Sequence, residues 1–569
     1  MKDAGIKAGR ALVLGSDSRS FLAVIRSLGR RNIQVHVICP DPDSPALRSR
    51  YISKHHVLPE YAAHPTTWIE GLDKLLRRES FDLVLPCDDP HIIKLTAYQA
   101  LGKSNSRLEL LPADLRELTS SKQRCHDLAS SLGVSVARSR LVESRQQLET
   151  AILELHPPYV LKPLSSFGAD DPITRREVRK AFTPDEAFSI GTLLLETSGL
   201  QLQENFIGTG TGVEFLASRG TILTAFQHLR LHEPLHGGGS SYRQGIPIDP
   251  RMYRATAAIV AAICYDGVGM VEFKWNRTTD EFVFIELNAR FWGSLPLAVA
   301  SGADFPWFLY QYRCHCERSF ARHFRLGLCC RNWTMDFHWV GSNALHDRHN
   351  PMLATKPWSV VLRELRSVLR GTERIDTLTH DDPQPFLAEL RNAARALARR
   401  FWRHCRACVW LRRHRARGIR RRIRHAGRIE FVCFGNICRS PFAEALAAQL
   451  HADGILHAAV SSSGFCALED RQSPAMAVSV AREFGIDLSQ HRSRRISADR
   501  VARADVIFVF DWANFDSLVA EFPQAETKTF LIGELDSDPS LAVPDPWNTS
   551  REMFRPVYRR LTAIVRGGL

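Results

Sequence analysis

The feature that most constrains this chain is a stretch of ten residues, Val-Cys-Phe-Gly-Asn-Ile-Cys-Arg-Ser-Pro at 432–441. The mostly apolar run 429–432 predicts a buried strand before it, and 441–450 predicts a helix after it. Ser440 suits the N-cap of that helix, and Pro441 suits its first position. Backbone N–H groups of such a tight loop converge as an anion-binding nest, and the helix N-terminus adds partial positive charge. The stretch therefore predicts a loop that binds an anion.

Two side chains give this loop its chemistry. Arg439 offers a planar guanidinium that can hold two phosphate oxygens at once. The positive field of the loop favours the thiolate form of Cys433, which is the nucleophilic form of a cysteine. Together they favour attack on a phosphoryl group over the alternative, a buried cysteine in an ordinary strand–helix turn.

A carboxyl group far along the chain supplies the missing proton donor. A thiolate that cleaves a phosphate ester needs a proton delivered to the leaving oxygen. Asp545 lies in the sequence Pro-Asp-Pro-Trp at 544–547. We expect the prolines and Trp547 to hold it in a rigid, partly desolvated loop, which favours the protonated acid.

The Cys-x5-Arg-Ser signature, the Ser-Ser-Ser-Gly run at 461–464 and the 544–547 motif resemble the low-molecular-weight protein tyrosine phosphatases, over residues 428–569. The resemblance implies a small α/β sheet with a P-loop, a phosphotyrosine protein as substrate, and no cofactor. It also implies that Cys433 attacks and forms a phosphocysteine. Arg439 and the amides of 434–438 would hold the transferring oxygens, and Asp545 would protonate the leaving group and then activate water.

The same resemblance gives roles to the residues around the nucleophile. Ser440 would hydrogen-bond the thiolate and improve it as a leaving group, and Asn436 would hold the shape of the loop. Phe434 and Trp547 would wall an aromatic leaving group.

Cysteines near the loop leave two questions open. Cys438 is either the partner of Cys433 in a protective disulfide, as the family suggests, or a small buried residue. Arsenate reduction uses the same loop, but it needs further cysteines to relay a disulfide outward. Beyond the loop this region has only Cys466, so arsenate reductase is kept as an alternative.

The first part of the chain alternates strands and helices. Apolar strands are predicted at 11–15, 35–39 and 83–86, with a helix at 21–28. This alternation predicts a parallel, doubly wound α/β sheet over residues 1–107. From 108 to 312 the pattern changes to longer strands, with a hairpin over 213–226 and paired strands at 269–275 and 282–290.

Charged and amide side chains gather on that last strand pair. Glu286 and Asn288 are two residues apart in a strand and share a face, and Glu272 lies on the partner strand. Their oxygens suit Mg²⁺, which bridges nucleotide phosphates. Arg290 falls on the same face, where it can contact a phosphoryl group. The alternative is a set of solvated polar residues on an exposed sheet.

Val-Leu-Lys-Pro at 160–163, Gln-Glu-Asn-Phe-Ile-Gly at 203–208 and Ile-Glu-Leu-Asn-Ala-Arg at 285–290 resemble the ATP-grasp fold, in the branch of the carbamoyl phosphate synthase large subunit. The resemblance covers roughly residues 10–312. It implies a parallel α/β pre-domain, α+β ATP-binding lobes, and the use of ATP to join a small carboxylate to an amine. By this resemblance, Lys122 and Lys162 bind the nucleotide phosphates and the adenine side, Gln203 forms the adenine hinge, and Glu204 holds the ribose. The residues implied for Mg²⁺ are Glu272, Glu286 and Asn288, and Arg290 supports the acyl phosphate.

One departure from the family affects this half. After Lys162 the family has a glycine-rich loop over the phosphates, whereas 163–171 contains one glycine, Gly168. The chain is therefore a bifunctional enzyme, or a phosphatase whose ATP-grasp half is a non-catalytic nucleotide or ligand sensor.

The region between the two halves, 313–427, resembles no family. The stretch 389–428 holds 15 arginines and one acidic residue, which equals the net charge of +14 for the whole chain. A 3-4-3-4 apolar stripe from Leu387 to Leu411 predicts a helix. Residues 385–428 would pack on a domain, lie on an anionic membrane surface, or clamp nucleic acid, the last being disfavoured without a recognisable module.

Composition sets the remaining expectations. The 13 cysteines are odd in number and scattered, no charged-then-apolar signal segment opens the chain, and no apolar run is long enough to span a bilayer. We expect a cytoplasmic protein with reduced thiols, either free or peripheral on the inner face of the membrane. Cysteine and histidine pairs at 314–316, 329–330 and 404–408 lack the spacing of known zinc sites.

Overall fold

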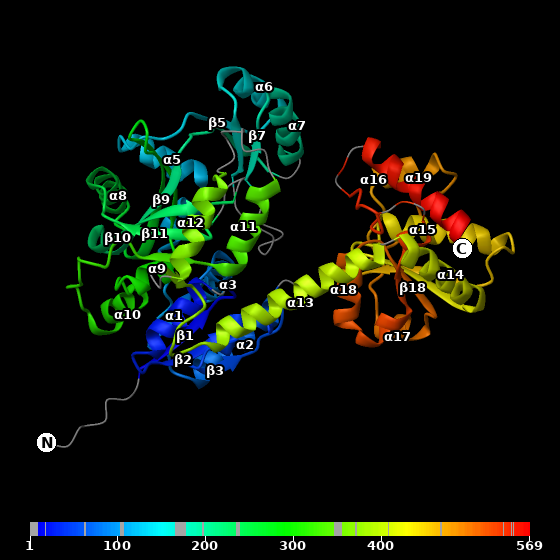
Figure 1. The fold of residues 1–569 in the computed structure, drawn as a ribbon, viewed down its shortest axis with the longest axis horizontal. Coiled ribbons are helices and arrows are strands. Elements are labelled where there is room, and N and C mark those ends of the chain that lie inside the picture. The colour runs from blue at the N-terminus through cyan, green and yellow to red at the C-terminus, as the bar shows by residue number, and fades with distance from the viewer. Residues whose placement is uncertain are drawn as a thin grey trace. The chain divides into compact units, whose positions relative to one another are not determined.

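The computed structural model describes residues 9–569 apart from 18, 62–63, 103–106, 165–177, 196–197, 235–238, 346–354, 370–372, 408, 467–468, 537, 539, 548 and 550. The chain divides into two compact units, Met1–Ala393 and Ala394–Leu569 (Figure 1). In the part of the chain that is described, no helix combines the length and the apolar character needed to cross a membrane.

The N-terminal unit begins with a parallel four-stranded sheet in the order β3-β2-β1-β4, as the alternation of strands and helices predicts. Its strands are β1 (Arg10–Leu14), β2 (Gln34–Ile38), β3 (Ile52–His56) and β4 (Leu83–Pro86). One face packs against α1 (Ser20–Gly29), and the other packs against α2 (Pro65–Arg78) and α3 (Asp89–Ala100). Alternate residues of β1 enter the two apolar clusters, because successive side chains of a strand point to opposite faces.

Two further sheets form the rest of this unit. The smaller is antiparallel, in the order β5-β8-β6-β7: β5 (Ser139–Val142), β6 (Tyr159–Pro163), β7 (Arg179–Ala181) and β8 (Leu200–Glu204). The larger has the order β13-β12-β9-β10-β11-β14-β15. Its strands are β9 (Thr209–Ser218), β10 (Thr221–His232), β11 (Tyr242–Ile246), β12 (Gly267–Asn276), β13 (Glu281–Asn288), β14 (Cys329–Arg331) and β15 (Glu373–Ile375). The predicted hairpin is β9–β10, and the predicted strand pair is β12–β13.

Helices flank these sheets. They are α4 (Ala113–Ser120), α5 (Lys122–Ser131), α6 (Arg145–Glu154), α7 (Pro184–Leu195), α8 (Pro250–Ala262), α9 (Leu295–Ala300), α10 (Phe305–His315), α11 (Trp333–Leu345) and α12 (Trp358–Leu369). Ser121 separates α4 from α5 and caps the second helix, its hydroxyl accepting the N–H of Arg124 at 3.3 Å. This cap places Lys122 at the first position of α5.

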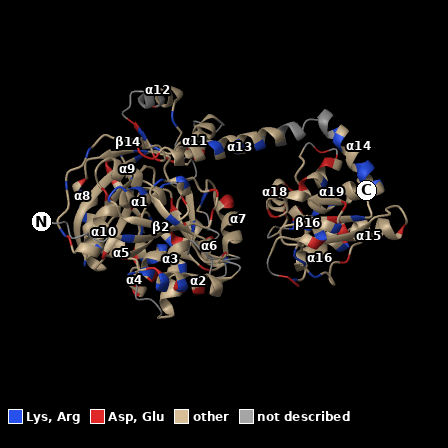
Figure 2. Cartoon of the chain, turned by 90° about the horizontal axis from the view of Figure 1, so that it is seen from below, with Lys and Arg blue, Asp and Glu red and all other residues tan. Residues whose placement is uncertain are grey.

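The boundary between the two units, after Ala393, divides the region 313–427. Strands β14 and β15 extend the large N-terminal sheet. The predicted long helix becomes α13 (Gln384–Ala407) and α14 (Val409–His425). Ile419 and Ile423 of α14 are buried in the core of the C-terminal unit, and Arg415 pairs with Glu534 at 3.1 Å. Basic side chains mark both helices in Figure 2.

The C-terminal unit holds one parallel sheet in the order β17-β16-β18-β19. Its strands are β16 (Arg428–Cys433), β17 (Ala459–Gly464), β18 (Val506–Val509) and β19 (Thr529–Leu531). Its helices are α15 (Arg439–Ala452), α16 (Ala475–Arg482), α17 (Ala498–Arg503), α18 (Trp512–Glu521) and α19 (Arg551–Gly568). Helices α15 and α19 pack together through Phe442 and Tyr558, whose rings stack with centroids 3.9 Å apart. This packing fixes the start of α15 over the end of the inner strand β16.

Candidate active sites

The predicted anion-binding loop runs from the last residue of β16 to the first turn of α15. Cys433 is 3% exposed, and its sulfur lies 3.0 Å from the hydroxyl of Ser440. The backbone N–H of Asn436 donates to the same sulfur at 3.3 Å. The Asn436 N–H and the Ser440 hydroxyl therefore both contact the sulfur, and both are able to donate to it when it is a thiolate.

Asn436 is hydrogen-bonded to three residues through its side chain. Its φ of 51° lies in the left-handed region, which asparagine tolerates better than most residues. Its side-chain amide donates to Ser440 at 3.0 Å and to Ser462 at 2.8 Å, and its side-chain oxygen accepts the N–H of Arg494 at 2.8 Å. A Cβ on Gly464 would lie 2.7 Å from the Phe434 carbonyl oxygen, so this close approach requires glycine.

Arg439 lies beside the acidic residues of the site. Its side chain is almost fully buried, donates to Asp511 at 2.6 Å and to the Val543 carbonyl at 3.0 Å, and pairs with Asp545. Burial alone would lower the pKa of Arg439, but the neighbouring Cys433, Asp545 and Asp511 outweigh it and raise the pKa. Asp511 is a partner that the sequence analysis missed, because it lies at the end of a different strand.

Asp545 is partly exposed: 43% of its side chain is open to solvent and the rest is covered. Phe434 and Trp547 are also exposed, at 61% and 54%.

Two further side chains brace the outside of the loop. His491 Nε2 lies 2.7 Å from the carbonyl oxygen of Asn436, and Arg471 donates to the carbonyl of Gly435 at 2.6 Å. Both contact carbonyl oxygens of the loop, while the N–H of Asn436 points at the sulfur of Cys433. Burial raises the pKa of Cys438, so that thiol is protonated at neutral pH.

The second site is a pocket of about 960 Å³ in the N-terminal unit. Every residue predicted for nucleotide or metal binding lines it: Lys122, Lys162, Gln203, Glu204, Glu272, Glu286, Asn288 and Arg290. They come from α5, from the small antiparallel sheet and from the β12–β13 pair. The tertiary structure thus brings together segments far apart in the chain, and the alternative of an exposed polar sheet face is wrong.

Three of these side chains form one oxygen-rich cluster. Glu272 and Glu286 are directly opposite in the β12–β13 register. The Asn288 amide donates to Glu286 at 2.9 Å and to Glu272 at 3.2 Å. Burial raises the pKa of Glu272 to about 7, although Arg230, which contacts it, acts in the opposite direction. Two carboxylates at one point fit the ligand preference of Mg²⁺, and Asn288 here directs its NH2 group, not its oxygen, toward them.

Lysines supply the positive charge of the pocket. Burial lowers the pKa of Lys162 to about 8 against the attraction of Glu286, and burial also lowers the pKa of Lys180 to about 8. Lys274 donates to the carbonyl of Phe206 at 3.3 Å. Desolvated ammonium groups of this kind are stabilised when phosphate oxygens bind to them.

Two predicted residues already have partners in the chain. The Glu204 carboxylate accepts the His156 N–H at 3.0 Å and contacts Arg138 at 3.2 Å. Arg290 donates to Asp89 at 2.6 Å, at the start of α3. A ribose or an acyl phosphate would share these groups with their present partners.

The sequence analysis missed one row of pocket residues. His228 and Arg230 alternate along β10 and line the pocket, as does Glu233 just after the strand. The signal was the alternation of polar and apolar residues from His228 to His232, which marks one polar face of a strand.

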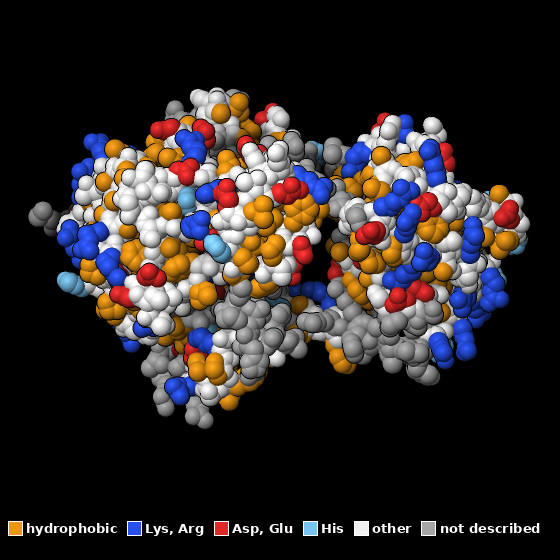
Figure 3. Space-filling model, turned by 90° about the horizontal axis from the view of Figure 1, so that it is seen from above, with side chains coloured by type: hydrophobic (Ala, Val, Ile, Leu, Met, Phe, Trp, Pro, Cys, Tyr) orange, Lys and Arg blue, Asp and Glu red, His pale blue; other side chains and the backbone are white. Residues whose placement is uncertain are grey.

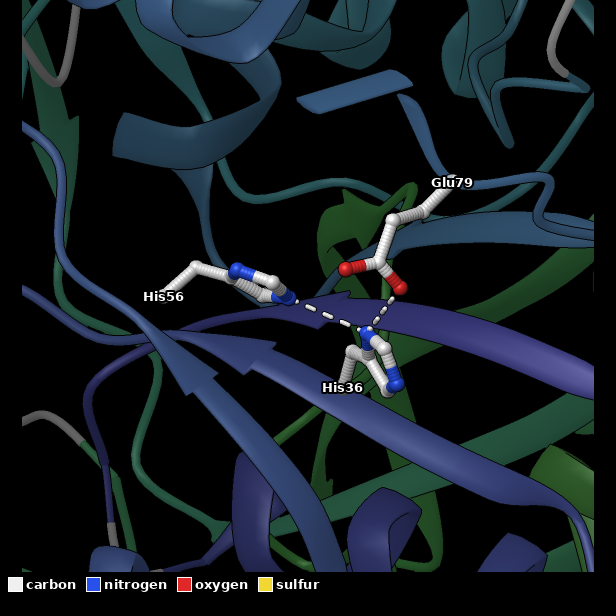
Figure 4. Close-up of side chains that lie close together, drawn as sticks. All are labelled: His36, His56 and Glu79. Atoms are coloured by element: carbon white, nitrogen blue, oxygen red, sulfur yellow. Dashed lines mark hydrogen bonds and ion pairs between the residues drawn. The ribbon is translucent and has the colours of Figure 1, made fainter. Parts of the chain in front are cut away.

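A separate group of possible metal ligands lies in the N-terminal sheet (Figure 4). His36 Nδ1 lies 3.0 Å from His56 Nε2 and 3.4 Å from Glu79. Glu79 is already paired with Lys54 at 2.7 Å and with Arg10 at 3.5 Å. These cations would repel a divalent ion, so the group is a hydrogen-bonded cluster rather than a metal centre.

Comparisons with known proteins match both halves. The model of the low molecular weight phosphotyrosine protein phosphatase family matches residues 428–567, and the model of the carbamoyl-phosphate synthase L chain, ATP binding domain, matches 249–305. The low molecular weight protein-tyrosine-phosphatase Wzb of Escherichia coli (strain K12) is 35% identical over 135 residues, which cover 24% of this chain and 88% of that protein. The protein-arginine-phosphatase of Geobacillus stearothermophilus is 31% identical over 138 residues, covering 24% and 90%.

Among solved structures, the ADP complex of N5-carboxyaminoimidazole synthetase from Staphylococcus aureus aligns at 14% identity with a TM-score of 0.45, covering 56% of this chain and 80% of that one. The family matches coincide with the two sites: 428–567 contains the loop, and 249–305 contains the carboxylate cluster of β12 and β13. The chain belongs to the low-molecular-weight protein tyrosine phosphatase family through its C-terminal unit, and it fuses that phosphatase domain to an ATP-grasp domain.

Proposed function

We propose that the C-terminal unit hydrolyses phosphotyrosine in proteins through a phosphocysteine. The observation that carries the proposal is the convergence of the Ser440 hydroxyl and the Asn436 N–H on the sulfur of Cys433. These donors hold the thiolate beside a loop built to bind phosphate oxygens. Hydrolysis of aryl phosphates and phosphotyrosine peptides by the full chain tests the proposal.

The reaction takes two displacements. In the first, Cys433 forms an S–P bond, the P–O bond to the aryl group breaks, and Asp545 gives its proton to the leaving oxygen. In the second, Asp545 takes a proton from water, the water oxygen bonds to phosphorus, and the S–P bond breaks. Ser440 stabilises the departing thiolate. Arg439 and the loop amides hold the phosphoryl oxygens in both steps.

Substrate entry requires Arg439 to exchange a partner. The guanidinium now pairs with Asp545 and with Asp511. A phosphate dianion in the loop offers Arg439 stronger acceptors, which frees Asp545 to act on the leaving group. The exposed rings of Phe434 and Trp547 supply apolar surface for an aromatic group.

Phosphoarginine is the second candidate substrate, because one relative is named a protein-arginine-phosphatase at 31% identity. Paired peptides that carry phosphotyrosine or phosphoarginine separate the two by their kcat/KM values. Arsenate reduction is tested with arsenate and a thiol reductant. It relies on a relay through Cys466, which is half-buried.

For the N-terminal unit we propose an ATP- and Mg²⁺-dependent ligase that joins a carboxylate to an amine. Glu272, Glu286 and Asn288 would hold Mg²⁺, and the convergence of their side chains supports this proposal. When bound, ATP supplies the phosphoryl group that activates the carboxylate. Lys122 and Lys162 bind its phosphates, and Gln203, 3% exposed on β8, lines the adenine side.

The sensor alternative depends on the loop after Lys162. Most of that loop, 165–177, lies outside the described residues. Release of ADP by the full chain with a panel of carboxylates and amines supports the ligase. Binding of nucleotide without ADP release across the panel supports the sensor.

We also propose that α13 contacts an anionic membrane surface. Its side chains Leu397, Phe401 and Trp402 are 53%, 68% and 60% exposed, among arginines. Ile419 and Ile423 of α14 are buried in the C-terminal core, so the proposed contact is assigned to α13. Co-sedimentation with phosphatidylserine vesicles, lost in Phe401→Ser/Trp402→Ser and at high salt, tests this. No nucleic-acid partner is proposed.

A further inference from the structure

The proposed nucleotide and metal residues account for part of the pocket. The rest of its lining includes Arg19 before α1, His228 on β10, and Trp292, Gly293 and Ser294 after β13. A volume of about 960 Å³ is at the upper end of the range for small-molecule sites. The pocket therefore has room for a second ligand besides the nucleotide.

Arg19 has a donor that the chain leaves unused. Its Nη1 atom is buried, and no described residue accepts a hydrogen bond from it. The ion pair of Arg19 is a long one, 3.9 Å from Nε to Asp17. Asp17 is also engaged elsewhere, since it accepts the N–H of Phe21 at 2.9 Å at the start of α1. A buried charged donor without an acceptor is unfavourable unless a ligand supplies one.

Glycine keeps the space around this guanidinium open. A Cβ on Gly293 would lie 2.6 Å from Nη1 of Arg19 and 2.9 Å from its Cζ. A Cβ on Gly239 would lie 3.1 Å from the same Nη1. Any side chain at 293 would therefore displace the arginine from its position at the pocket.

The neighbouring carboxylates are committed to other cations. Asp89 pairs with Arg290, and Asp376 pairs with Arg243. Glu214 is buried, and burial raises its pKa well above the usual range, so it is protonated beside His228. Burial is the main cause that lowers the pKa of Arg19; Arg243 and Arg290 act in the same direction, whereas Asp17 and Asp376 oppose it. The unpartnered Nη1 atom in the pocket is therefore the observation that favours the arrival of an anion.

We propose that the carboxylate substrate of the ligase carries a second anionic group, separate from the carboxylate that is activated, and that Arg19 binds this second group. The inference rests on the ligase function proposed above and narrows its substrate class. The substrate is a small acid with two anionic groups, the second being a carboxylate or a phosphate. Acids with a single anionic group leave Nη1 of Arg19 without an acceptor.

The test measures ADP release by the full chain with matched acids that share a carbon chain. Butyrate, glutarate and 4-phosphonobutyrate differ in whether the far end is a methyl, a carboxylate or a phosphonate, and longer and shorter sets extend the panel. Arg19→Met and Arg19→Lys are compared with Arg48→Met, which alters an exposed arginine near the start of the chain. Aryl phosphate hydrolysis by the same samples sets them to equal concentration, and an unchanged KM for ATP shows that the N-terminal unit of each variant is folded.

We expect doubly charged acids to be preferred, and the carboxylate and phosphonate arms identify which anion fits. Arg19→Met should raise KM for these acids about 30-fold or more, with the KM for ATP unchanged and partial recovery in Arg19→Lys. The inference is overturned, and the ligase retained, if singly charged acids serve equally well or Arg19→Met leaves all KM values unchanged.

If no acid stimulates the release of ADP by the full chain, the ligase proposal fails, and the anion site is tested by itself. Isothermal titration of the full chain with glutarate and with inorganic phosphate then measures binding directly. Binding that Arg19→Met abolishes and Arg48→Met preserves supports the anion site. No binding to the unaltered chain, or equal binding to Arg19→Met, overturns it.

Discussion

The two proposed phosphoryl-binding sites of this chain use different kinds of anion-binding group. In the phosphatase loop, the anion-binding groups are backbone N–H donors and one arginine, all within 433–439. In the ATP-grasp pocket they are lysine and arginine side chains from several elements, facing buried carboxylates. Backbone donors have no proton to lose, whereas buried side chains titrate near neutrality, as Lys162 and Glu272 do with pKa values of about 8 and 7. The anion-binding groups of the loop are therefore contiguous in sequence and keep their donors near neutral pH. The anion-binding groups of the pocket come from distant segments, and their charge changes with pH.

Removal of the Cys433 nucleophile should distinguish the activities of the two halves most clearly. Cys433→Ser should abolish aryl phosphate hydrolysis, a loss of about 10⁴-fold or more, because the weaker nucleophile cannot form the phosphocysteine. The same variant should keep ADP release, since the site lies in the other unit. Retained phosphatase activity would show that another residue is the nucleophile.

The matching change in the pocket is Glu286→Ala. We expect ADP release to fall about 10³-fold, because the oxygen cluster loses a carboxylate in a buried site. Glu281→Ala alters an exposed glutamate on the same strand and serves as the control. Phosphatase activity should be unchanged in both. Equal ADP release by the two variants would remove the carboxylate cluster from the mechanism.

A smaller effect is expected at the proton donor. Asp545→Asn should lower kcat for phenyl phosphate by about 10²- to 10³-fold, because the leaving oxygen no longer receives a proton. The loss should shrink for p-nitrophenyl phosphate, whose leaving group needs less protonation. A loss that is the same for both esters would point to a structural role through the ion pair with Arg439.

The smallest effect tests the contrast in pH dependence. Lys162 is charged below a pKa of about 8 and neutral above it. The kcat/KM for ATP, which reports the free enzyme, should therefore fall as pH rises through 8. Lys162→Arg should remove this decline, since arginine stays charged. Phosphatase kcat/KM, measured between pH 7 and 9 in the same variants, should not differ between Lys and Arg at 162.

The basic residues can also be compared in the sequence and on the folded surface. The net charge of +14 is concentrated in 389–428 by the sequence. Basic side chains are nevertheless spread over the C-terminal unit in the view of Figure 3. Residues 429–569 contribute basic side chains of their own, and α14 also packs on this unit and pairs Arg415 with Glu534, so part of the basic segment belongs to a folded surface.

The sequence by itself determined the features that depend on neighbouring residues. The strand–loop–helix around Cys433 was predictable because its apolar run, loop and helix are contiguous, although the helix begins at Arg439, one residue before the predicted N-cap Ser440. Glu286 and Asn288 were predictable as a pair because the side chains of a strand alternate with a period of two. The parallel first sheet followed from the alternation of strands and helices.

Only the tertiary structure decided which distant residues meet. The order of strands in the large sheet brings Arg230 of β10 to Glu272 of β12, a contact between residues that no local pattern joins. Asp511 reaches Arg439, and Arg19 reaches the nucleotide pocket, for the same reason. The exposure of Asp545 also came from the fold, since two prolines fix a loop but not the solvent around it. Burial and pairing are properties of the packed chain, so the charges of this protein acquire their partners only when its sheets assemble.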